Sequence, residues 1–103
     1  MSANVTFPSA SKYYLAQFFS YLSTMWYYVY ILELNNKKHY IGCTTDVKER
    51  FRRHSKGNVP STKAYRPLKL IWCCAFSDRY KAYQFERHLK SGSARDFTLR
   101  HLF

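Results

Sequence analysis

The segments Tyr28-Val29-Tyr30-Ile31-Leu32 and Tyr40-Ile41-Gly42, joined through the polar run Asn35-Asn36-Lys37-Lys38, predict a β-hairpin at the centre of this chain. Asparagines tolerate the positive backbone dihedral angles of tight turns, and β-branched and aromatic residues flank them on both sides. With a loop of two or three residues, paired positions have numbers that sum to about 71 or 72. Tyr30 is therefore expected opposite the Ile41 to Gly42 region, with Tyr40 within diagonal reach.

A helix is predicted directly after the hairpin, over residues 44–54. Asp46 and Glu49, three residues apart, are close to a capping box, because their carboxylates can accept hydrogen bonds from the unpaired amides of the first turn. Val47 and Phe51, four residues apart, predict the buried stripe of this helix.

Two polar residues of this helix, Arg50 and His54, fall on or beside its apolar stripe. An arginine in that position needs either an internal carboxylate or an anion brought by a ligand. For His54 two interpretations stay open, a residue of a functional site or a cation that offsets the helix dipole at the C-terminal end.

The rest of the chain supplies a third strand and a second helix. Residues 67–73 alternate apolar side chains as a strand does, and residues 78–90 carry a helical stripe of Ala82, Phe85 and Leu89. The segment 55–66, with a glycine and a proline, is predicted to be a loop. The expected fold is α+β, a small three-stranded antiparallel sheet flanked by helices. Its expected core is Val29, Ile31, Ile41, Phe51, Leu68, Leu70, Trp72, Phe76, Phe85 and Leu89.

Charge divides the chain into two parts. Lysine and arginine number 17 against 6 acidic residues, and every one of these cations except Lys12 follows residue 25. Residues 1–24 are therefore expected to be an N-terminal extension, either an added helix or a disordered leader, and residues 25–103 the functional domain. A polyanion is the natural partner of such a domain, although basic surfaces also serve solubility or contact with ribosomes and membranes.

Cysteine content and hydropathy bear on the compartment. The three cysteines, Cys43, Cys73 and Cys74, are odd in number and lack the spacing of a disulfide framework or a zinc site, which favours a reducing, cytoplasmic location. No run of apolar residues approaches the length of a membrane span, so no membrane partner is expected.

The chain from Trp26 onward resembles the GIY-YIG nucleases, most closely the small stand-alone bacterial members related to the nuclease domain of the excision-repair incision subunit. The resemblance lies in the two hairpin half-motifs, Tyr28-Val29-Tyr30 with tyrosine in place of the leading glycine, and Tyr40-Ile41-Gly42. It continues through Arg50 and His54 into Ser61-Thr62-Lys63, Arg66-Pro67 and Phe85-Glu86, and covers about 75 residues. The asparagine that many larger members carry after the metal glutamate has no counterpart in residues 95–98.

The resemblance implies a set of site residues. The catalytic residues would be Tyr30, Tyr40, Arg50 and His54, with either tyrosine as the base that activates water. Glu86 would hold one divalent ion, Mg²⁺ or Mn²⁺, because magnesium keeps most of its waters and needs few protein ligands. A surface pair between Glu86 and Lys90 is the alternative interpretation. Contacts to nucleic acid are expected from Lys48, Arg53, Lys63, Arg66 and Lys90.

Two functions are compatible with these residues. The first is a metal-dependent DNA endonuclease that hydrolyses phosphodiester bonds, with structure-directed cleavage and a role in DNA repair as the expectation. The alternative is a weakly catalytic or non-catalytic nucleic-acid-binding module that acts with a partner. Nothing in the sequence distinguishes recognition of a 2′-hydroxyl, so RNA stays open as a substrate. No small-molecule cofactor is expected, and the sequence does not specify an oligomeric state.

Overall fold

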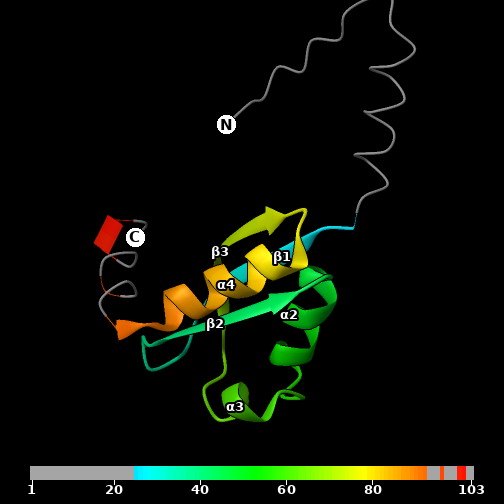
Figure 1. Ribbon diagram of the computed structural model, residues 1–103. Helices are drawn as coiled ribbons and strands as arrows, with labels where there is room; N and C mark the ends of the chain where they lie inside the picture. The colour runs from blue at the N-terminus through cyan, green and yellow to red at the C-terminus, as the bar shows by residue number, and fades with distance from the viewer. Residues whose placement is uncertain (1–24, 93–95, 97–99, 102–103) are drawn as a thin grey trace, which may run out of the picture.

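The computed structural model describes residues 25–92, 96 and 100–101. The extension expected at residues 1–24 lies outside them. Three strands form one antiparallel sheet in the order β2-β1-β3, so the described sheet has β1 at its centre (Figure 1). The prediction of an α+β fold with a three-stranded antiparallel sheet is confirmed. The elements in chain order are β1 (Tyr27–Glu33), β2 (His39–Thr44), α2 (Val47–Ser55), α3 (Pro60–Lys63), β3 (Lys69–Phe76) and α4 (Arg79–Lys90).

The hairpin has the predicted register. Tyr30 pairs with Gly42, and the numbers of paired residues sum to 72 along the ladder from Tyr28 and Thr44 onward. The left-handed residue of the turn is Lys37, with φ of 69°, rather than one of the two asparagines. Asn36 instead uses its side-chain oxygen to accept a hydrogen bond from the Lys38 amide at 3.0 Å. The asparagine therefore stabilises the turn through its side chain.

Helix α4 covers one face of the sheet, where it lies over β1 and β2 (Figure 1). Its N-cap is Asp78, whose carboxylate accepts hydrogen bonds from the Tyr80 and Lys81 amides, and this agrees with the predicted start of the helix. Successive residues of a strand point to opposite faces, so β1 presents alternate side chains to α4. The core on this face consists of Val29, Ile31, Ile41, Ala82 and Leu89, with Trp72, Phe76 and Phe85 partly buried against it.

Helices α2 and α3, which contact each other, differ from the prediction in two ways. Asp46 is the N-cap of α2 and accepts from the Glu49 amide at 3.0 Å, as expected, but Val47 and Phe51 are only half-buried. His54 is the fully buried residue of this helix. The segment predicted to be a loop contains the short helix α3, which begins at Pro60, a residue suited to the first turn of a helix.

The third strand corrects the predicted core. Leu70 was expected to face inward with Trp72, but 39% of it is exposed. A bulge in β3 explains this, because Ile31 pairs with Trp72 while the next residue of β1, Leu32, pairs with Leu70, which leaves Ile71 as an extra residue of β3. An extra residue reverses the alternation of faces beyond it. Strict alternation therefore fails at this point of β3.

Two leucines test the corrected core. Leu89→Ala should lower the free energy of unfolding by about 2–5 kcal/mol, because this side chain is 1% exposed and its removal leaves a cavity against the sheet. Leu70→Ala, the matched control, should lower it by less than about 1 kcal/mol, as expected for a partly exposed site. Urea unfolding followed by circular dichroism measures both, and equal losses would contradict the bulged register.

Candidate active site

The Tyr30 side chain lies across Gly42 on the neighbouring strand. An added Cβ at Gly42 would overlap the hydroxyl and ring of Tyr30, so glycine is required where the ring crosses β2. Tyr30 is 1% exposed, and its hydroxyl lies 2.9 Å from Nε2 of His54. The hairpin and α2 therefore meet through one buried hydrogen bond between side chains that are 24 residues apart.

A second hydrogen bond fixes the other side of the imidazole. Nδ1 of His54 lies 2.8 Å from Oγ1 of Thr62, a completely buried residue of α3. The Thr62 hydroxyl itself donates to the carbonyl of Val59 at 3.4 Å. Tyr30, His54, Thr62 and the Val59 carbonyl thus form a continuous chain of polar groups inside the protein.

The direction of this chain assigns the histidine tautomer. Thr62 has one hydroxyl proton, and we assign it to the contact with the Val59 carbonyl; the Thr62 oxygen then accepts from His54, and Nδ1 carries the imidazole proton. Nε2 is then a lone-pair acceptor, and the Tyr30 hydroxyl donates to it. The imidazole is positioned to receive a proton from tyrosine.

Electrostatics keep both members of the pair neutral. Burial, with smaller contributions from the positive charges of Arg50 and Arg53, lowers the pKa of His54 below its usual value. Burial, followed by the nearby Tyr40, raises the pKa of Tyr30 to about 12, although Arg50 opposes that rise. Burial of His54 and the lowered pKa both argue against its interpretation as a cation at the end of a helix and favour its interpretation as a residue of the site.

Tyr40 completes the aromatic side of the site. Its ring centroid lies 5.1 Å from that of His54 in an edge-on arrangement and 6.4 Å from that of Tyr30. The edge-on contact between Tyr40 and His54 is attractive and helps to fix the orientation of the imidazole. Tyr40 is only half-buried, so it lies on the open side of Tyr30 and His54.

Arg50 carries the cationic group nearest to the Tyr30–His54 pair that can meet a substrate. It is half-buried on α2, and no salt bridge joins it to any acidic residue in the part of the chain that the structure describes. Its charge acts on Tyr30, Cys43 and His54. Of the two partners expected from the sequence, the internal carboxylate is not found among the described residues, and the guanidinium hydrogen-bonds to the Tyr30 side chain instead.

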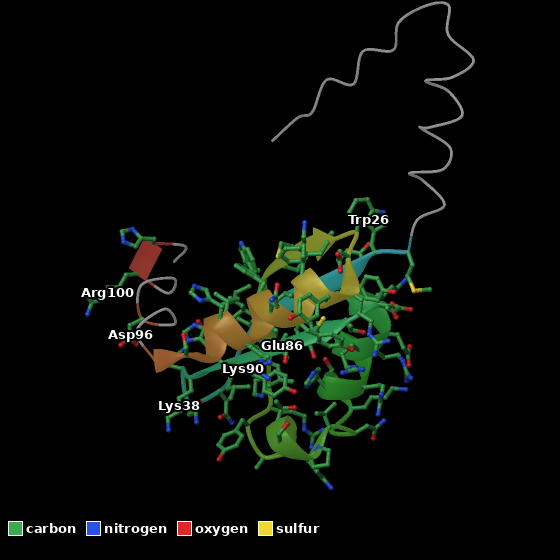
Figure 2. The ribbon with its side chains drawn as sticks, viewed as in Figure 1. Trp26, Lys38, Glu86, Lys90, Asp96 and Arg100 are labelled. Carbon is green, nitrogen blue, oxygen red and sulfur yellow. The ribbon has the colours of Figure 1, made fainter. Side chains whose placement is uncertain are left out.

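Glu86 reaches the site from α4. Figure 2 shows it on the side of that helix which faces β2. Its side chain is 17% exposed and accepts a hydrogen bond from the Lys90 ammonium at 2.8 Å. Its charge raises the pKa values of Tyr30 and Cys43, although burial is the larger cause for both. Residues from both faces of the sheet therefore come together at β2, an edge strand of the described sheet.

The donor set at Glu86 suits one hard cation. Among the described residues, no three histidine, cysteine, aspartate or glutamate side chains gather as a metal cluster. A carboxylate that already accepts an ammonium ion lies in a position that favours positive charge, and magnesium needs only one or two protein carboxylates when water supplies its other ligands. Glu86 fits that requirement.

The side chains expected to contact nucleic acid differ in whether they already make hydrogen bonds or ion pairs within the protein. Lys48, Arg53 and Lys63 are exposed. Arg66 is exposed too, but its guanidinium donates to the carbonyls of Lys63 and Ser55 and lies against Gly57, so much of it stabilises the loop. Lys90 pairs with Glu86, and this is the surface pair considered as an alternative from the sequence.

Thr62 is the site residue that sequence reasoning missed. It lies within the Ser61-Thr62-Lys63 segment that carries part of the family resemblance, yet threonine near a proline also fits an ordinary loop. The only signal in the sequence was a hydroxyl residue eight positions after His54. This signal is weak, because contact between the two residues depends on the turn that α3 makes.

Comparison with known proteins adds independent information. A family model described as the GIY-YIG catalytic domain matches residues 26–99. UPF0213 proteins from Streptococcus pneumoniae and Vibrio campbellii are 38% and 36% identical over 64 and 63 residues, which is 61% and 60% of this chain. The matched regions cover 65% and 61% of those relatives, which is less than two thirds of their length.

A solved structure is also similar. The solution NMR structure of a UPF0213 protein from Bacillus halodurans aligns with a TM-score of 0.50 and 32% identity, covering 76% of this chain and 85% of that one. In the described residues no helix is both long and apolar enough to span a bilayer.

Thr62→Val tests the tautomer assignment. Without the hydroxyl, the Nδ1 proton of His54 loses its buried acceptor, which carries a cost of about 1–3 kcal/mol and favours the other tautomer. We expect the ¹⁵N spectrum of the imidazole to shift toward the form protonated at Nε2, which cannot accept from Tyr30. Thr62→Ser keeps the hydroxyl and should retain the original spectrum. An unchanged tautomer in the valine variant would show that Thr62 does not set it.

Proposed function

The chain belongs to the GIY-YIG family, and we propose that it is a metal-dependent endonuclease that hydrolyses phosphodiester bonds in DNA. The observation that carries this proposal is the buried hydrogen bond from the Tyr30 hydroxyl to Nε2 of His54, next to an arginine that has no carboxylate partner in the described structure. A module that only binds nucleic acid needs surface cations, whereas this pair also sets a proton donor and a proton acceptor beside the arginine.

The Tyr30–His54 pair would allow a protonated tyrosine to act as a base. A tyrosine with a pKa of about 12 is almost entirely protonated at pH 7, so it cannot act as a preformed phenolate. It can act as a relay instead. The oxygen of Tyr30 accepts a proton from the attacking water while its own proton passes to Nε2 of His54. The water oxygen forms a bond to phosphorus, the bond from phosphorus to the leaving oxygen breaks, and solvent protonates that oxygen.

The other residues orient and neutralise the substrate. Arg50 would donate two hydrogen bonds to phosphoryl oxygens, for which a planar guanidinium is well suited. Tyr40, half-exposed and edge-on to His54, would orient the attacking water. Glu86 would hold one Mg²⁺ or Mn²⁺ ion, which when bound supplies positive charge for the phosphoryl and leaving oxygens. Lys48, Arg53 and Lys63 would contact phosphates farther along the strand, and Arg66 and Lys90 would do so only in part.

The net charge and the free cysteines bear on the partner and the compartment that we propose. A net charge of +11 favours association with DNA through release of counterions, so binding should weaken steeply with salt. Three free cysteines are compatible with a reducing compartment, and we place the enzyme in the cytoplasm with a role in DNA repair.

One observation favours the alternative of a binding module that cuts poorly. Glu86 already accepts the Lys90 ammonium at 2.8 Å, and a divalent ion must displace that ammonium in order to bind. Cleavage and binding therefore have to be measured separately.

Cleavage of supercoiled plasmid in magnesium, by the wild type beside Glu86→Gln, tests the enzyme assignment. The variant should lose about 100-fold or more in rate, because it lacks the charged ligand for the ion. Glu49→Gln is the matched control, since Glu49 is exposed and pairs with Arg52, and its rate should stay within about twofold of the wild type. Binding in EDTA should be retained by all three proteins. Binding without cleavage on every substrate would favour the binding module.

The pH dependence tests the relay. An imidazolium cannot accept the Tyr30 proton, so cleavage should fall as the pH drops through the pKa of His54. Because that pKa is lowered, the fall should be centred below about 6.5, the ordinary value for histidine. The raised pKa of Tyr30 means that no loss from its ionisation is expected below about pH 10. An acid limb centred at or above pH 7 would exclude a neutral buried His54 as the acceptor.

A further inference from the structure

One stripe of α4 carries more than the acidic residue of the site. Arg79, Tyr83, Glu86 and Lys90 follow one another at spacings of four, three and four residues, so they share a face of the helix. The proposed nuclease uses Glu86 and pairs it with Lys90. Arg79 and Tyr83 have no role in that chemistry.

These two residues form an exposed aromatic platform. The Arg79 guanidinium carbon lies 5.3 Å from the centroid of the Tyr83 ring, within the range of a cation–π interaction. Tyr83 is nevertheless 44% exposed. Part of the ring thus remains available to a ligand while the arginine adds positive charge beside it.

A half-open pocket of about 280 Å³ lies against this platform, between the start of α4 and the adjacent strands. Its walls combine aromatic rings and sulfur atoms with threonine hydroxyls and a guanidinium. The lining side chains used in the argument are Tyr27, Cys43, Thr44, Arg79 and Tyr83. We refer to this space as the α4 pocket.

The α4 pocket adjoins the candidate active site. Cys43 follows Gly42 directly in β2, and the pKa of its thiol, raised mainly by burial, also responds to the charges of Glu86, Arg50 and Arg79. One helical turn separates Tyr83 from Glu86, a rise of about 4.5 Å along the axis. A group held in the pocket would therefore lie next to the phosphate that is cut.

We propose that the α4 pocket binds an unpaired nucleobase next to the scissile phosphate, stacked on Tyr83 and Arg79. This inference rests on the proposed nuclease function and names its substrate class, DNA with a gap, flap or fork. A flat aromatic ligand attached to a polyanion matches both an exposed ring and a guanidinium. A base inside a duplex is stacked on its neighbours and cannot enter such a pocket without unpairing.

Binding measured in EDTA tests this inference independently of cleavage. The wild type should bind gapped DNA more tightly than intact duplex of the same sequence. Tyr83→Ala should weaken binding to the gapped DNA by about 5- to 100-fold and leave duplex binding unchanged, because stacking is lost while the cations remain. Tyr83→Phe should retain the preference. Tyr80→Ala, at a tyrosine that is 69% exposed and does not line the pocket, is the matched control.

A second measurement identifies the group that is bound. Replacing the unpaired nucleotide by an abasic one should remove the advantage of the gapped DNA for the wild type, and 2-aminopurine at that position should change its fluorescence on binding. Circular dichroism checks that the variants are folded. Equal affinity for abasic and intact gaps, or an equal effect of Tyr83→Ala on duplex and gapped DNA, would overturn the inference. Plasmid cleavage by a protein with no preference for gaps would overturn it while leaving the nuclease assignment in place.

Discussion

The passage of the Tyr30 ring over the bare backbone of Gly42 is the contact on which the rest of the site depends. Any larger residue at position 42 would push the phenol away from His54. With the phenol in place, the imidazole has a partner on each nitrogen, and α2 and α3 are joined to the hairpin through Tyr30 and Thr62. Because the apolar residues of α2 are only half-buried, the attachment of α2 to the hairpin depends largely on these polar groups. The side chains that hold these helices in place are therefore also the side chains of the proposed site.

The charged groups of the site surround a neutral pair, Tyr30 and His54. The buried pair is neutral, Arg50 has no acidic partner among the described residues, and Glu86 is close enough to influence Tyr30. Burial alone would make proton removal from Tyr30 harder, and arginine offsets only part of that cost. An arriving phosphate would satisfy the arginine and favour a positively charged imidazole. In the proposed reaction, the substrate phosphate would therefore lower the cost of moving a proton from Tyr30 to His54.

Local chemistry was enough to predict the hairpin register, the Asp46 cap and the start of α4 at residue 78, because each depends on neighbours in sequence. The buried state of His54 could not be predicted, since it arises from contacts with β1 and α3 that lie 24 and eight residues away. Thr62 was missed for the same reason. Leu70 was misplaced because a bulge leaves no mark in an alternating pattern. The sequence indicated two roles for Glu86, a ligand of a divalent ion and a partner of Lys90. The spacing of Glu86 and Lys90 fits both roles.

The buried position of His54 has a consequence for turnover. Its imidazole is completely enclosed, and its second nitrogen donates to a threonine that is itself enclosed. A proton that reaches Nε2 has one way out, back through the hydroxyl from which it came. In the proposed reaction, His54 thus acts as a reservoir for a single proton and has no exit to bulk water. The enzyme would be reset only after the product leaves and the phenol returns that proton to a new water molecule, which ties recovery of the base to product departure.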